Sequence, residues 1–143
     1  VQWWRDATGL VGAAGDTEAM AAGVPDSGGA VFVPAFTGLG APFWDPAARA
    51  ALAGVTRGTT REHLARAVLE SVAFSVRAVV DAMAADSGLA LPSLRVDGGM
   101  TDNATLLQIQ ADALGVPVER PALAEATAWG AAAFAGVAAG MFS

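Results

Sequence analysis

The stretch that most constrains the fold is 94–103, a short apolar run followed by two glycines and then polar residues. Alternation of side chains in 94–97 predicts a strand with Leu and Val on one face. Gly98 and Gly99 allow a tight turn and let a ligand approach the main chain closely. Thr101 or Asp102 is predicted to cap the helix that follows. The stretch therefore indicates a buried strand, a turn and a helix start.

A helix start of this kind carries free N–H groups and about half a positive charge, which suits a bound nucleotide. The same pattern is more often an ordinary strand-to-helix turn, and the turn by itself leaves both interpretations open.

Length and composition favour one globular domain. The chain has 143 residues, 54% of them hydrophobic and 15% charged, and this composition excludes a disordered chain. The net charge is −6 and no basic block is present, which argues against nucleic acid and anionic membranes as partners. Residues 126–143 carry no charge but are rich in alanine and glycine, so we expect a buried helix there rather than a membrane span.

The residue types exclude several kinds of chemistry. All eight basic residues are arginines, and lysine is absent. The chain therefore has no P-loop lysine to bind phosphates and no amine side chain for a Schiff base. Cysteine is absent, which excludes disulfides, thiolate nucleophiles and zinc–cysteine sites. The single His63 cannot build a multi-histidine metal site, and its position predicts a role near a helix cap. No metal ligands are predicted.

Helices and strands alternate along the chain. Periodicity and breakers predict helices over 1–11, 16–23, 60–86, 103–114 and 125–141, and strands over 30–33, 51–55, 94–96 and 116–118. Pro117 favours an edge position for the last strand. This order predicts a layered α/β domain.

Local signals refine these elements. Asp16 is predicted to cap the second helix, and Thr59 with Glu62 forms a capping-box pattern before the long helix. One apolar face of that helix is expected to cover a sheet; it contains Leu64, Val68, Val72, Val76, Val79 and Met83. Residues 34–44 form an aromatic loop, expected to be buried over the sheet rather than to form a partner surface. Three glycines in the last helix predict close packing of another element.

Six segments together resemble the FGGY family of carbohydrate kinases, and within it the glycerol kinases. They occur in the family's order and spacing, and they cover essentially the whole chain. These segments are Gln2-Trp3-Trp4-Arg5-Asp6, Ala14-Gly15-Asp16-Thr17-Glu18, residues 33–44, Val96-Asp97-Gly98-Gly99-Met100, residues 108–114 and residues 125–132.

The resemblance implies a partial actin-like, ribonuclease-H-like ATPase domain. Residues 1–143 would form a single C-terminal nucleotide-binding domain, with the N-terminal domain absent. The implied reaction transfers the γ-phosphoryl group of ATP, with Mg²⁺, to glycerol. By position in the motifs, the implied nucleotide-binding residues are Gln2, Gly99 and Asn103. Asp97 would lie near the nucleotide.

The family's catalytic base and most of its glycerol-binding residues would lie upstream of this chain, so no catalytic residue is predicted here. Because the chain starts abruptly with Val1, we expect a piece of a larger protein, inactive alone and prone to associate through an unpaired sheet edge. The family further implies a cytoplasmic homo-oligomer, a dimer or a tetramer. Two alternatives remain: another FGGY sugar kinase of the xylulose or gluconate type, or a non-catalytic actin-like nucleotide-binding module.

Overall fold

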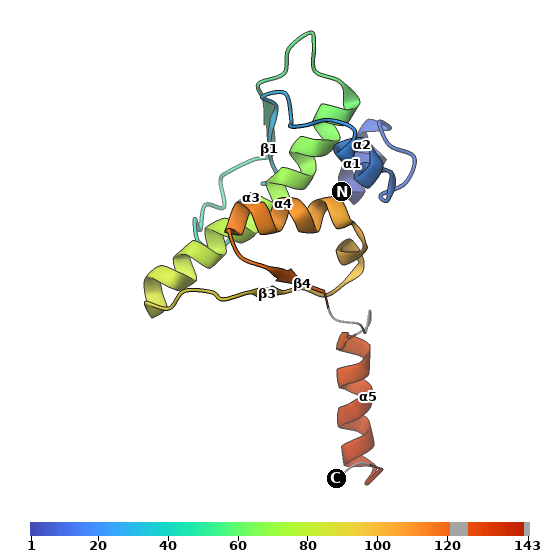
Figure 1. The fold of residues 1–143 in the computed structure, drawn as a ribbon, viewed down its shortest axis with the longest axis vertical. Helices are drawn as coiled ribbons and strands as arrows, with labels where there is room; N and C mark the ends of the chain where they lie inside the picture. The colour runs from blue at the N-terminus through green and yellow to red at the C-terminus, as the bar shows by residue number, and fades with distance from the viewer. Residues whose placement is uncertain (121–125, 142–143) are drawn as a thin grey trace.

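The computed structural model describes residues 1–120 and 126–141. Figure 1 shows its helices and strands. The helices are α1 (Gln2–Thr8), α2 (Asp16–Ala22), α3 (Arg61–Ser87), α4 (Ala104–Leu114) and α5 (Ala126–Ala138), with a 3₁₀ turn, η1 (Gly99–Asp102). The strands are β1 (Val31–Val33), β2 (Ala51–Ala53), β3 (Leu94–Arg95) and β4 (Val118–Glu119).

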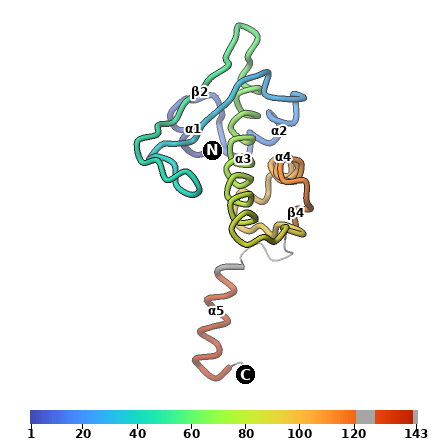
Figure 2. The backbone as a smooth tube through the Cα atoms, turned by 90° about the vertical axis from the view of Figure 1, so that its left-hand side faces the viewer, coloured from blue at the N-terminus to red at the C-terminus, as the bar shows by residue number. Residues whose placement is uncertain are grey.

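Helix α3 is the element around which the others pack. It contacts α2, α4 and β1, and Figure 2 shows it with α1 and β2 on one side and with α2, α4 and β4 on the other. Its first half supplies the buried residues, among them Ala65, Ala67 and Ala73, whose small side chains let neighbouring helices approach closely. The predicted apolar stripe is buried or half-buried as far as Val79, and its last member, Met83, is 63% exposed.

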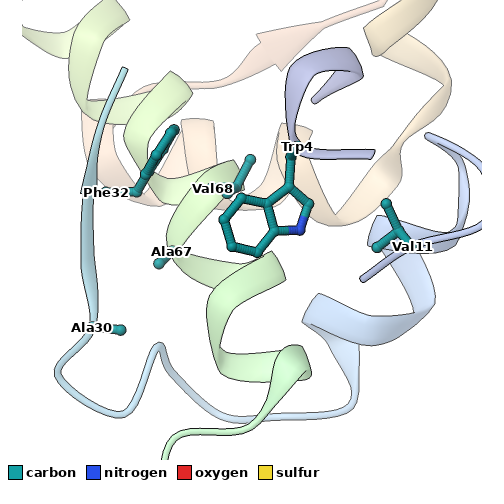
Figure 3. Close-up of a cluster of buried hydrophobic side chains, with 6 residues drawn as sticks. All are labelled: Trp4, Val11, Ala30, Phe32, Ala67 and Val68. Atoms are coloured by element: carbon teal, nitrogen blue, oxygen red, sulfur yellow. The ribbon is translucent and has the colours of Figure 1, made fainter. Parts of the chain in front are cut away.

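One hydrophobic cluster joins α1 and β1 to α3. Figure 3 shows Trp4 and Phe32 packed beside Val68, with Val11 on the far side of the indole. The rings of Trp4 and Phe32 meet edge to face, with centroids 6.0 Å apart. The indole N–H of Trp4 is buried and has no hydrogen-bond partner among the described residues. Burial of the large ring surface offsets the cost of that donor.

A second cluster holds α2 and α4 against α3. Leu69 and Ala73 of α3 meet Ala21 of α2 and two residues of α4, Leu106 and Ile109. Two polar contacts reinforce this packing: the Gln110 amide donates to the carbonyl of Ala73 (3.3 Å), and Arg77 donates to that of Ala113 (2.6 Å). This cluster fixes the position of the α4 start, where the candidate site lies.

The strands form two separate two-stranded sheets. β1 and β2 pair antiparallel, with Phe32 opposite Leu52. β3 and β4 pair in parallel across α4, with Leu94 opposite Val118, which makes the predicted β-α-β unit. β4 begins at Val118, one residue after Pro117. The carbonyl of Pro117 accepts from the N–H of Leu94 (2.9 Å), but proline has no N–H and can donate no bond to the sheet. Leu94 is half-buried rather than buried as predicted.

Several predicted helix boundaries move. α1 ends at Thr8 because Gly9 adopts a left-handed conformation, three residues before the predicted end. The carboxylate of Asp16 accepts from the N–H of Ala13 (2.8 Å), so Gly15 rather than Asp16 stands at the cap position of α2. α3 ends at Ser87 and α4 at Leu114, each just before a glycine in the left-handed conformation, Gly88 and Gly115. Both helix ends are confirmed to within one residue.

The capping box of α3 is shifted by one residue. The hydroxyl of Thr59 accepts from the N–H of Thr56 (2.8 Å), so it is not available to the helix. Thr60 is the cap residue, and its N–H donates to Nδ1 of His63 (3.1 Å). The prediction that His63 lies near a helix cap is confirmed, whereas the pairing of Thr59 with Glu62 was wrong.

The aromatic side chains of the loop 34–44 are exposed rather than buried, although Ala35 is fully buried. Phe43 and Trp44 are 60% and 75% exposed, and Phe36 is 43% exposed. The ring centroid of Phe36 lies 4.6 Å from that of Trp3 and 6.0 Å from that of the core residue Phe32. α5 makes no contact with any other helix or strand among the described residues, so the close packing expected at its glycines is not observed there. The predicted start of this helix at Glu125 lies outside the described residues. Within the described part, no helix is both long and apolar enough to span a bilayer.

A low pKa is expected for Glu62, in the first turn of α3. Its bonds to the Arg61 guanidinium (2.8 Å), to the Thr60 hydroxyl and to backbone N–H lower its pKa from 4.5 to about 2. The folded state is then stabilised above pH 4.5, and this stabilisation is lost as the pH falls towards 2. NMR titration of the Glu62 carboxyl should give a midpoint near 2, rising towards 4.5 in Arg61→Ala. A midpoint near 4.5 in the unaltered protein would contradict the geometry.

Candidate functional site

The turn after β3 has a conformation that requires glycine. Gly98 has φ +97° and ψ 170°, a region essentially closed to residues with a Cβ. Pairing continues to this point, because the N–H of Val96 donates to the carbonyl of Glu119 (3.0 Å). The turn then enters η1, where the hydroxyl of Thr101 donates to the carbonyl of Gly98 (2.7 Å).

The cap of α4 differs from the prediction. η1 occupies Gly99–Asp102, so α4 starts only at Ala104 and its cap residue is Asn103. Oδ1 of Asn103 accepts from the N–H of Leu106 (2.8 Å). Thr101 and Asp102 therefore do not cap the helix: the Thr101 hydroxyl is bonded within the turn, and Asp102 lies 3.8 Å from Arg120.

A second carboxylate reaches the same helix start from α2. Oε1 of Glu18 accepts from the N–H of Ala104 (2.9 Å), across 86 positions of sequence. The hydroxyl of Thr105 adds a longer bond to the carbonyl of Glu18 (3.5 Å). Sequence reasoning missed this role of Glu18, because no local pattern links it to α4. These contacts bring the start of α2 beside the glycine turn.

Residues 14–18 and 99–103, together with Val1, line a cavity of about 140 Å³. Its lining comes from the start of the chain, from 14–18 and from 99–103; the residues are Val1, Ala14, Gly15, Thr17, Glu18, Gly99, Met100, Asp102 and Asn103. This volume is below the roughly 300–1,000 Å³ of whole small-molecule sites, so the cavity fits part of a ligand. No side chain touches the space where a Cβ of Gly99 would lie, so the main chain there is open to a ligand.

The structure brings two of the three predicted nucleotide residues together. Gly99 and Asn103 both line the cavity. Gln2 is exposed on α1 and is not among the lining residues, although its neighbour Val1 is. Asp97, which was expected near the nucleotide, is also outside the lining; its carboxylate accepts from the N–H of Gly98 (2.8 Å).

The charge of the cavity suits the uncharged end of a ligand. Its lining holds the carboxylates of Glu18 and Asp102 and no lysine or arginine side chain. A base or a sugar could use the amide of Asn103 and the main chain at Gly99. A larger hollow of about 260 Å³ lies between β1 and α3. It is almost wholly apolar, with two serine hydroxyls, and offers little to orient a polar ligand.

The chain is similar to known proteins over nearly its whole length. Residues 1–139 match the model of the FGGY family of carbohydrate kinases, C-terminal domain. Glycerol kinase 2 of Thermotoga maritima is 57% identical over 140 residues, which cover 98% of this chain and 28% of that protein. The crystal structure of Plasmodium falciparum glycerol kinase with ADP aligns over 99% of this chain and 28% of its own, at 35% identity and a TM-score of 0.87. Xylulose kinase from Rhodospirillum rubrum aligns over 73% and 21%, at 36% identity and a TM-score of 0.64.

Proposed function

This chain belongs to the FGGY family of carbohydrate kinases, and from that membership we propose that it is the nucleotide-binding part of a glycerol kinase. The observation that carries the proposal is 57% identity to a glycerol kinase over nearly the whole chain. The xylulose kinase structure aligns over 73% of the chain with a TM-score of 0.64, against 99% and 0.87 for the glycerol kinase structure, which makes the xylulose or gluconate type the weaker alternative. The reaction proposed is transfer of the ATP γ-phosphoryl group to glycerol.

The chain spans about 28% of the length of the glycerol kinases it matches. We propose that residues 1–143 act as one nucleotide-binding domain, and that the catalytic base and most glycerol contacts come from protein outside this chain. Phosphoryl transfer depends on positioning and on charge stabilisation by several groups at once. The chain alone is therefore expected not to phosphorylate glycerol. The proposal includes a cytoplasmic homo-oligomer as the native form, a dimer or a tetramer.

We place the base and ribose of ATP in the cavity between 14–18 and 99–103. Three features support this placement: the open main chain at Gly99, the amide of Asn103 and the absence of cationic side chains from the lining. The Plasmodium falciparum glycerol kinase, which this chain resembles, was solved with ADP, and this supports an adenine nucleotide as the class of ligand. Gln2 is proposed as a further contact at the cavity edge, next to Val1.

Mg²⁺ is expected to accompany ATP, as the family resemblance implies. Among residues 1–120 and 126–141, no group of three or more histidine, aspartate or glutamate side chains could share a metal ion. The cavity carboxylates lie at the end proposed for the base, away from phosphates. No step of the reaction is assigned to a metal ligand of this chain.

Two substitutions of Asn103 distinguish its role as the helix cap from its proposed contact with the nucleotide. Asn103→Asp keeps the oxygen that accepts from Leu106 but loses the amide donor. The KM for ATP should rise about tenfold, equivalent to about 1.4 kcal/mol, with the melting temperature unchanged. Asn103→Ala should also lower the free energy of unfolding by about 1 kcal/mol. Steady-state kinetics and thermal melts of the native polypeptide measure both; an unchanged KM in Asn103→Asp would remove Asn103 from the site.

The proposed reaction is tested with the native polypeptide that carries this chain. Purified protein is given ATP and Mg²⁺ with glycerol, xylulose or gluconate, and the phosphorylated product is identified by mass spectrometry. Glycerol 3-phosphate as the main product is expected. Preference for another acceptor would assign a different sugar kinase, and nucleotide-dependent assembly without product would assign an actin-like module.

A further inference from the structure

Glu18 and Asn103 saturate two of the N–H groups that open α4. The first N–H groups of a helix have no partner within it and need an acceptor from elsewhere. Ala104 donates to Glu18 (2.9 Å) and Leu106 donates to Asn103 (2.8 Å). One acceptor is local, while the other comes from α2. The start of α4 is therefore fixed to a separate element of the fold.

The same glutamate lies between the two walls of the cavity. Glu18 is half-buried and lines the cavity together with Gly99 and Asn103 on the opposite wall. Its bond to Ala104 crosses from one wall to the other. The distance between the walls, and hence the place of the Asn103 amide, depends on this bond.

The packing beneath the cavity does not depend on the carboxylate. Ala21 of α2 and Leu106 and Ile109 of α4 meet in the second hydrophobic cluster, below the cavity. This apolar contact holds α2 and α4 together when the side chain of Glu18 is shortened or neutralised. Loss of the bond should therefore loosen the cavity while the domain stays folded.

We propose that Glu18 is a positioning residue for the nucleotide, which acts by holding Asn103 and Gly99 at the correct distance from α2. This inference rests on the proposed function, because it names the residue that shapes the proposed ATP site. Glu18 acts through its reach and its acceptor oxygen rather than through its charge. The carboxylate oxygen Oε1 that accepts from the N–H of Ala104 is the side-chain contact of Glu18 with α4, whereas the longer bond from the Thr105 hydroxyl reaches the main-chain carbonyl of Glu18.

Substitutions of different reach test the proposal in the native polypeptide. Glu18→Gln keeps both the length and an acceptor oxygen, so its KM for ATP should stay within about twofold. Glu18→Asp keeps the charge but is one methylene shorter, and Glu18→Ala removes the acceptor. Both should raise the KM for ATP about five- to twentyfold, with kcat and the KM for glycerol changed less than twofold. The control Asp26→Ala, which removes a carboxylate bonded to the N–H of Gly28 (2.7 Å), should leave all three unchanged.

A double-mutant cycle with Asn103→Ala shows whether Glu18 acts through Asn103. The effect of Glu18→Ala on the KM for ATP should largely disappear in the Asn103→Ala background. Additive effects would overturn the proposal, and so would a larger loss in Glu18→Gln than in Glu18→Asp. If Glu18→Ala does not fold, the KM values for ATP of Glu18→Gln and Glu18→Asp decide instead, and the higher KM is expected in Glu18→Asp. An active unaltered protein with unchanged variants refutes this inference alone, whereas an unaltered protein that neither binds ATP in calorimetry nor phosphorylates glycerol refutes the proposed function.

Discussion

Alanine at Gly54 is expected to prevent the chain from reaching its folded state. Gly54 directly follows β2 and has φ +74°, a left-handed conformation that costs other residues about 1–2 kcal/mol. A Cβ there would overlap the carbonyl oxygen of Gly29 and lie 3.0 Å from the carbonyl carbon of Gly29. Both neighbours are backbone, so β1 and β2 would have to separate. We expect a loss of more than about 4 kcal/mol, seen as insoluble protein or the absence of a cooperative thermal transition.

Gly88 provides the matched control for this change. It has a similar φ of +70° at the end of α3, but nothing lies within 4 Å of its Cβ position. Gly88→Ala should cost only the conformational term of about 1–2 kcal/mol and leave a cooperative transition. Equal melting temperatures for the two variants would show that β1 and β2 do not approach each other as the structure has them.

Alanine at Gly99 is expected to have the opposite profile, with a normal fold and poor nucleotide binding. Gly99 starts η1, its φ is not in the left-handed region, and its Cβ position has no atom within 4 Å. The added methyl group therefore meets nothing in the protein and enters the cavity instead. Where a ligand lies against the main chain, such overpacking costs about 1–3 kcal/mol, or roughly 5- to 150-fold in the KM for ATP.

The control for Gly99 is the same substitution away from the cavity. Gly58→Ala also has room for a Cβ, with the Thr56 hydroxyl 3.7 Å away. Thermal melts of both variants should match the unaltered protein, and only Gly99→Ala should lose ATP affinity in calorimetry. An unchanged affinity would mean that the nucleotide does not approach Gly99.

The parts of the fold that follow from local chemistry were predictable. The left-handed glycines Gly88 and Gly115 mark helix ends because only glycine adopts that conformation without strain. The cap of α4 was not predictable, since the 3₁₀ turn makes the helix start at Ala104 rather than at 103 and a local pattern cannot distinguish Asp102 from Asn103. The exposure of Trp44 was also missed, because hydrophobicity predicts burial without saying what covers the ring.

The candidate site was predictable only in part. Gly99 and Asn103 were identified through the resemblance to FGGY kinases. The structure places both in the lining of one cavity, and their contact with a nucleotide stays a prediction. Glu18 was missed, because its role depends on a contact across 86 residues that only the packing of α2 against α4 creates. Residues that act through their own turn can be found in a sequence, whereas residues that join distant elements need the fold.

Photolabelling with an azido-adenine nucleotide tests whether the base of ATP lies in the cavity between 14–18 and 99–103. The native polypeptide is irradiated with the probe, with and without excess ATP, and labelled residues are mapped by mass spectrometry. Labels are expected within 14–18 or 99–103, and they should be lost when ATP is added but retained with inorganic phosphate. Labels confined to other parts of the chain, such as the hollow between β1 and α3, or labels that ATP does not displace, would contradict this placement of the base.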